Sequence, residues 1–108
     1  MDWQSQLDAE FDRAAQARAR ENEGQARVCA RRAAGIAIRE YLSRRGIRPP
    51  STSAYDLLNL IKEDSALPPG LKRIADHLTV RVTEEFKLPL DVDLVAEARQ
   101  FCDELLKT

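Results

Sequence analysis

Several residue types are scarce in this sequence of 108 residues, and their scarcity argues against whole classes of site. There is one histidine, and the two cysteines are Cys29 and Cys102. Neither a metal cluster nor a disulfide framework is expected from so few ligands. The four glycines form no phosphate-binding loop. We therefore expect no metal site and no cofactor, and we interpret both cysteines as buried structural residues.

The chain also lacks a long hydrophobic segment. The longest nearly apolar run covers only residues 33–38, whereas a membrane-spanning helix needs about 20 apolar residues. The chain does not start with a basic region followed by an apolar stretch, as a secretory signal does. With 44% hydrophobic residues and a net charge of −1, the composition is typical of a folded domain. We expect one domain over residues 1–108, in the cytoplasm and without membrane contact.

Apolar residues recur at spacings of three and four along nearly the whole chain, which predicts an all-α protein. We expect an up-and-down antiparallel bundle of about five helices. Residues 21–24 predict a break after the first helix. The second helix, residues 25–45, contains no proline, carries small residues along one side and is followed by Gly46. This pattern is typical of the central helix of a bundle.

Three shorter helices are expected after the proline pair at 49–50. The first begins at Ser53, which stands three residues before an acidic residue as in a capping box. The next has Pro69 in its first turn and an apolar stripe that continues through Val82 and Phe86. The last is capped by one of the two aspartates at 91 and 93.

Positive charge is concentrated in the middle of the chain. Residues 13–48 contain ten arginines and three acidic residues, while both flanking segments are net acidic. Arg32 and Arg39 lie seven residues apart, on one face of the second helix, and Gly35 between them leaves room for a phosphate or a partner's backbone. Two interpretations are open: a basic face for RNA, a nucleotide or an acidic partner, or pairing with acids of neighbouring helices.

Arg73 and His77 form the arrangement with the clearest catalytic potential. One turn apart on a helix, they share a face. An arginine stabilises a phosphoryl transition state and a histidine moves a proton, which together suit metal-independent cleavage of RNA. The alternative is a surface pair on a solvated helix face.

The alanine-rich second helix, together with the segment that follows it, resembles the HEPN domain, a nucleotide-binding domain of higher eukaryotes and prokaryotes. The resemblance covers roughly residues 5–106. It is carried by the following residues: Ala26, Cys29, Ala30, Arg32, Ala33, Ala34, Ala37, Ile38, Arg39, Tyr41, Leu42, Gly46, Pro49, Pro50, Ala54, Tyr55, Asp56, Leu57 and Leu58.

The resemblance implies a helical bundle that commonly dimerises and whose small prokaryotic members often pair with a minimal nucleotidyltransferase, in some cases as toxin and antitoxin. Some members are ribonucleases that carry an arginine and a histidine with four to six residues between them; only three residues lie between Arg73 and His77, one fewer than in that motif. We assign nucleotide or partner binding to four residues: Arg32, Arg39, Tyr55 and Arg81.

We therefore expect a non-catalytic module that binds a nucleotidyltransferase partner, a nucleotide or RNA, and no DNA. The alternatives are an endoribonuclease that uses Arg73 and His77 and a purely structural adaptor. We further expect a homodimer, because Trp3, Leu7 and Phe11 lie on a helix that one subunit does not fully cover.

Overall fold

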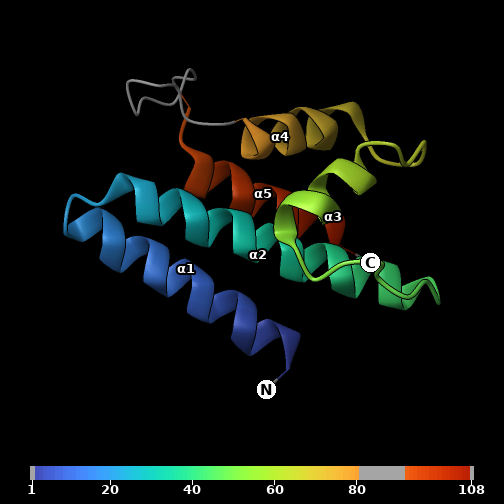
Figure 1. Cartoon of the computed structure of the whole chain (residues 1–108), viewed down its shortest axis with the longest axis horizontal. Coiled ribbons are helices and arrows are strands. Elements are labelled where there is room, and N and C mark those ends of the chain that lie inside the picture. Colours follow the sequence, from blue (N-terminus) through green and yellow to red (C-terminus); the bar gives the residue numbers. More distant parts are fainter. Residues whose placement is uncertain (1, 81–91, 108) are drawn as a thin grey trace.

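Figure 1 shows the protein as a computed structural model, which describes residues 2–80 and 92–107. The described ranges contain helices and no strand, so the prediction of an all-α bundle is confirmed. The five helices are α1 Trp3–Ala19, α2 Glu23–Arg44, α3 Ala54–Ile61, α4 Pro69–Thr79 and α5 Leu94–Leu105.

Short polar side chains set the starts of the helices, as the sequence predicts. Ser53 caps α3 and Asp93 caps α5, each through a side-chain oxygen that accepts a backbone N–H of the first turn. Asn22 does the same for α2, at 3.1 Å from the nitrogen of Gln25. The break after α1 is therefore shorter than expected: it covers residues 20–22, and Glu21 turns the chain with a φ of 59°.

The expected length of the fourth helix is wrong. α4 has Pro69 in its first turn, as predicted, but it ends at Thr79, and Val80 already has an extended backbone with φ −67° and ψ 133°. Two β-branched residues in a row disfavour a helix, and the Thr79 hydroxyl donates to carbonyls of the last turn. The remainder of the expected stripe, Val82 and Phe86, lies outside the described residues, as does Asp91.

α2 is the central helix, as predicted. It packs against α1, α3 and α5 and touches α4, whereas α1 has little contact with any helix other than α2. Consecutive helices α1–α2 and α4–α5 are antiparallel, but α5 runs in the same direction as α2 (Figure 1). Two contacts agree with this: the Cys102 thiol donates to the Ala33 carbonyl, and Arg44 near the end of α2 donates to the Leu106 carbonyl just after α5.

The short length of α3 explains this direction. Eight residues of helix span about 12 Å, whereas the 22 residues of α2 span about 33 Å. The segment 45–53 and α3 therefore cover only a short distance along α2. α4 then runs back along the bundle and α5 returns beside α2 (Figure 1).

Small side chains let α1 and α2 approach closely. Their contact is a cluster of fully buried residues, Ala14, Ala17, Ala26 and Cys29. In the main core, the alanines of α2 meet larger apolar side chains of α3, α4 and α5, together with Phe11 of α1. Both cysteines are buried, as expected. None of the described helices is long and apolar enough to cross a membrane.

The α1 residues that were expected to need a second subunit are largely covered within one chain. Phe11 is only 5% exposed, and the Arg99 guanidinium lies 4.2 Å from the centre of its ring. Leu7 packs against the main core, and Trp3 is half-buried beneath Arg44. Of the three residues, Phe11 is therefore buried within one chain and Trp3 and Leu7 are covered only in part, and the dimer stays a prediction.

Candidate functional site

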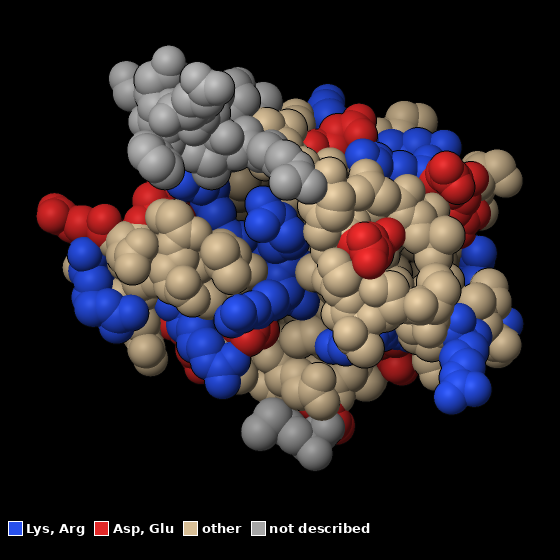
Figure 2. All heavy atoms as spheres, in the orientation of Figure 1, with Lys and Arg blue, Asp and Glu red and all other residues tan. Residues whose placement is uncertain are grey.

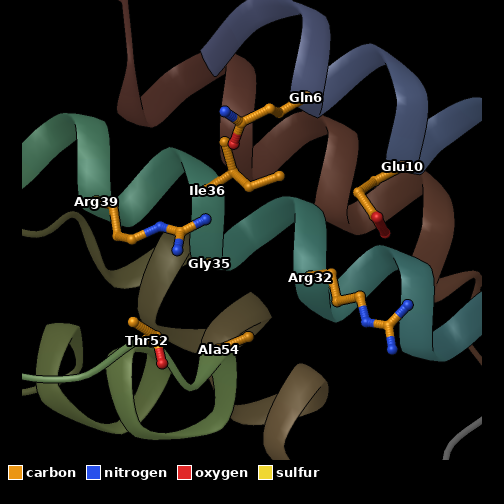
Figure 3. Close-up of a pocket in the computed structure, with 8 residues that line it drawn as sticks. All are labelled: Gln6, Glu10, Arg32, Gly35, Ile36, Arg39, Thr52 and Ala54. Atoms are coloured by element: carbon orange, nitrogen blue, oxygen red, sulfur yellow. The ribbon is translucent and has the colours of Figure 1, made fainter. Parts of the chain in front are cut away.

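A pocket of about 380 Å³ lies over the middle of α2, between α1 and the segment that leads into α3 (Figure 3). Its volume falls within the range of small-molecule sites, roughly 300–1,000 Å³. Three segments contribute the residues that line it: Gln6 and Glu10 from α1, Arg32, Gly35, Ile36 and Arg39 from α2, and Thr52 and Ala54 around the start of α3.

Gly35 shapes this pocket in a way that the sequence did not reveal. A Cβ at this position would lie 2.8 Å from the Cβ of Ala54 and 3.1 Å from its Cα. The expectation that Gly35 leaves room for a phosphate or for a partner's backbone is therefore wrong, because the start of α3 already occupies that space. The glycine allows α2 and α3 to approach closely and so sets one wall of the pocket.

The structure brings Arg32 and Arg39 to the same pocket, as predicted. In Figure 3 the Arg39 side chain extends along α2 towards Gly35, whereas Arg32 points away from Gly35, at the opposite end of the pocket. Arg39 is half-buried and Arg32 is exposed. Within the described parts of the chain, neither arginine has a hydrogen bond or ion-pair partner. Both guanidinium groups are thus available to an acceptor.

Other arginines do pair with acidic residues. Arg18 binds Glu23 and Asp93, which draws the end of α1 towards the start of α5. Arg44 and Arg45 are paired in the same manner, with Glu40 and Asp64 respectively. Part of the basic segment is therefore paired with acids of the fold, whereas Arg32 and Arg39 are among the arginines that no described acid neutralises.

Glu10 is the pocket residue that sequence reasoning missed. It is the one charged side chain in the described core, with 7% of its surface exposed. Its Oε1 accepts a hydrogen bond from Arg13 at 2.5 Å, but its Oε2 is buried and has no partner among the described residues. A signal existed in the sequence: Glu10 falls at helical spacing within the apolar stripe of Leu7, Ala14 and Ala17.

A second hollow of about 340 Å³ adjoins the pocket towards the start of α1. It shares Gln6, Ile36 and Arg39 with the pocket, and Trp3 and Glu40 complete its lining. The two hollows together form a groove along α2 that runs from Arg32 to Glu40. Arg32 and Glu10 lie towards one end of this groove, whereas Arg39 lies where the two hollows meet and Glu40 lies at the other end.

Basic side chains are also visible on the broader surface. Figure 2 shows lysine and arginine gathered in the hollow at the centre of the displayed face, with acidic side chains nearer its edges. Arg31 of α2 is engaged within the fold, since its Nε donates to the Leu78 carbonyl at 2.8 Å near the end of α4. The basic segment of the sequence therefore serves both packing and exposed surface.

The other predicted binding residues do not line the pocket. Tyr55 is half-buried on α3, and Thr52 and Ala54 of the same segment line the pocket in its place. Arg81 lies outside the described residues. The predicted binding face is thus represented in the pocket by Arg32 and Arg39.

Arg73 and His77 lie on α4, which does not contribute to the pocket. Arg73 is exposed, while the His77 side chain is 19% exposed and its Nδ1 lies 2.7 Å from the Glu97 Oε1 of α5. A carboxylate that accepts a hydrogen bond from Nδ1 holds the ring in one orientation. The same contact also links α4 to α5 structurally.

No group of three or more metal-ligating side chains occurs in residues 2–80 and 92–107. Comparison with protein-family models, with curated proteins and with solved structures gives no match for this chain. The case for a function therefore depends on the chemistry of the pocket.

Proposed function

We propose that this protein is a non-catalytic helical module that binds an anionic group in the pocket between α1, α2 and α3. Arg39 and Arg32 are the residues that contact the anion. In the cytoplasm, the anion would be the phosphate of a nucleotide or of RNA, or an acidic group of a nucleotidyltransferase partner. The HEPN resemblance supports this choice of ligands.

One observation carries the proposal: two arginines that line one pocket and have no partner in the described chain. A guanidinium presents a rigid fork of donors that matches phosphate and carboxylate. Side chains that only solubilised a helix would not need to line one pocket. A purely structural adaptor does not account for two arginines in the same pocket that no described acid neutralises.

The test is calorimetric titration of the protein with ATP, with a short single-stranded RNA and with a candidate nucleotidyltransferase, at two salt concentrations. We expect affinity for at least one of them to fall as salt rises, because screening and counterion release weaken such contacts. The variant R32A/R39A should lose at least tenfold in affinity. Its melting temperature should change little, since neither arginine forms an ion pair with a described residue.

The matched control is R20A/R48A, which removes the same charge from two exposed arginines outside the pocket. If the control weakens binding as much as R32A/R39A, then the attraction is due to overall charge and the pocket is not the site. Equal affinity of wild type and R32A/R39A would also reject the proposal.

The second candidate function is a metal-independent endoribonuclease with Arg73 and His77 as its site. The contact between His77 and Glu97 supports it, because it would orient a proton-transferring ring. Incubation of a labelled RNA with wild type, with R73A and with H77A, all in the presence of a chelator, tests this alternative. Cleavage by wild type that both variants lose would favour the nuclease over the binding module.

A further inference from the structure

Glu10 places a negative charge beside the two arginines, and an anion alone does not explain it. Its side chain is 9% exposed and extends from α1 towards α2 at the edge of the pocket (Figure 3). Its Oε2 has no hydrogen-bond partner in the described parts of the chain. A buried carboxylate oxygen without a donor is unfavourable, so native proteins almost always satisfy such an atom.

The charged groups around Glu10 differ in whether they are already paired. Arg13 already occupies Oε1, while Arg32 and Arg39 are not paired with Glu10 or with any other described acid. Unused donors line the pocket, and the residue with the unused acceptor oxygen lines it as well. An inorganic anion would satisfy the arginines but would be repelled by the carboxylate of Glu10.

We propose that the pocket binds a small zwitterion of the α-amino acid class, with its anionic group at Arg39 and its ammonium group at Glu10. This inference rests on the proposed function, because it assumes that the pocket takes an anion. The terminal torsion of a glutamate is broad, so the carboxylate can turn its free oxygen to the pocket while the rest of the side chain stays in place. Gln6 and Thr52 supply neutral polar groups around the same volume.

The adjoining hollow gives room for the rest of such a ligand. It continues from Gln6 and Arg39 to Trp3 and Glu40, so a side chain on the ligand would extend along α2. Carboxylates near both ends of the groove suit a ligand that carries both signs of charge.

The experiment is a thermal-shift screen of the wild-type protein with each of the twenty amino acids, followed by calorimetry on the strongest binder. That amino acid is then compared with the carboxylic acid that has a hydrogen in place of its amino group. We expect the amino acid to bind at least tenfold more tightly than the matched acid. In E10Q the difference should shrink to about twofold, and R39Q should weaken both ligands.

The control variant is E63Q, which neutralises an exposed glutamate after α3 and should keep the wild-type preference. A matched acid that binds wild type as tightly as the amino acid overturns the inference, as does an unchanged preference in E10Q. The comparison of the two ligands needs only wild-type protein, so the inference stays testable if E10Q does not fold. If ATP or RNA binding depends on Arg32 and Arg39 while no amino acid binds, this inference fails and the proposed function stands.

Discussion

At the scale of single residues, Asp64 shows how one carboxylate joins separate parts of the bundle. It accepts hydrogen bonds from the Ala66 N–H at 2.9 Å, the Tyr41 hydroxyl at 2.9 Å and the Arg45 guanidinium at 3.2 Å. These contacts, that of the Ala66 N–H first, hold the pKa of the carboxyl below its usual value. Burial, followed by the hydrogen bond to Asp64, raises the pKa of the Tyr41 hydroxyl. Asp64 thus ties the end of α2 to the loop before α4.

Replacement of this carboxylate should destabilise the protein in a pH-dependent manner. Because the folded pKa is depressed, its contribution is complete above the unfolded pKa of about 4 and is lost as pH falls through the folded value. We expect D64N to lower the free energy of unfolding by about 1 kcal/mol at pH 7. Urea unfolding at pH 7, 5 and 3 should show the deficit shrinking below pH 4. D8N, at an exposed position, is the control, and a deficit that persists undiminished at pH 3 would contradict the assignment.

The two thiols provide a second prediction at this scale. Cys29 and Cys102 are both buried, and burial raises the pKa of the Cys102 thiol to about 12. Since the thiolate is the reactive form, a thiol reagent at pH 8 should modify neither residue in the folded protein and both after unfolding in urea. Rapid modification of either cysteine in the native state would show that its surroundings open easily.

At the scale of helices, the contact between α2 and α3 depends on Gly35 and Ala54. A glycine in the middle of a helix lowers helix stability by about 1 kcal/mol relative to alanine. Here it is required, because a Cβ would collide with the Cα and Cβ of Ala54. This helix pair therefore exchanges some local stability for a close approach that forms one wall of the pocket.

We expect G35A to destabilise the protein by roughly 1–3 kcal/mol, in spite of the better helix propensity of alanine. The matched control is G24A, also in α2, where a Cβ makes only ordinary contacts at 3.8 Å or more and which should be neutral or slightly stabilising. Adding A54G to G35A should restore part of the loss, because it removes the closest clashing atom. Thermal unfolding of the wild type and of these three variants measures this, and a G35A protein as stable as G24A would show that the two helices separate at little cost.

At the scale of the whole molecule, the state of association stays a prediction that follows from the HEPN resemblance. The side chains of α1 first considered for an interface are largely covered by their own chain. The exposed large hydrophobic residues of the described surface are Ile47 and Leu60, which line a shallow apolar hollow with Leu42 and Ile61. Such a patch is a candidate for contact between subunits.

Sedimentation at micromolar concentration should therefore give the mass of a homodimer, about twice the 12.2 kDa of the chain. I47D/L60D should shift the protein towards the monomer without loss of helical content, since both side chains are already exposed. A wild-type protein that sediments as a monomer would contradict the dimer, and a dimer that the double variant leaves intact would place its interface elsewhere.

Most helices and helix ends of this protein could be predicted from its sequence, because they depend on interactions between residues close together in the chain. The apolar spacing, the capping side chains at 22, 53 and 93, Pro69 and Gly46 depend on residues within one or two turns, so they predict the helices and most of their ends. The same periodicity places Arg32 and Arg39 on one face. Only the end of α4 differed substantially from its predicted position. The low helix preference of Thr79 and Val80 outweighed the apolar stripe that predicted a longer helix.

The pocket itself was decided by the tertiary structure, since its walls come from three separate segments of the chain, at residues 6–10, 32–39 and 52–54. The position of Ala54 against Gly35 and the burial of Glu10 depend on how three helices pack, and helical periodicity carries no information about distance between helices. Which arginines find an acid was decided in the same way, because ion pairs such as Arg18–Asp93 form only when distant helices are brought together. The sequence determined which residues lie on each face of each helix. Packing determined which faces are in contact, because a charge is buried, paired or left unpaired only by the helices that surround it.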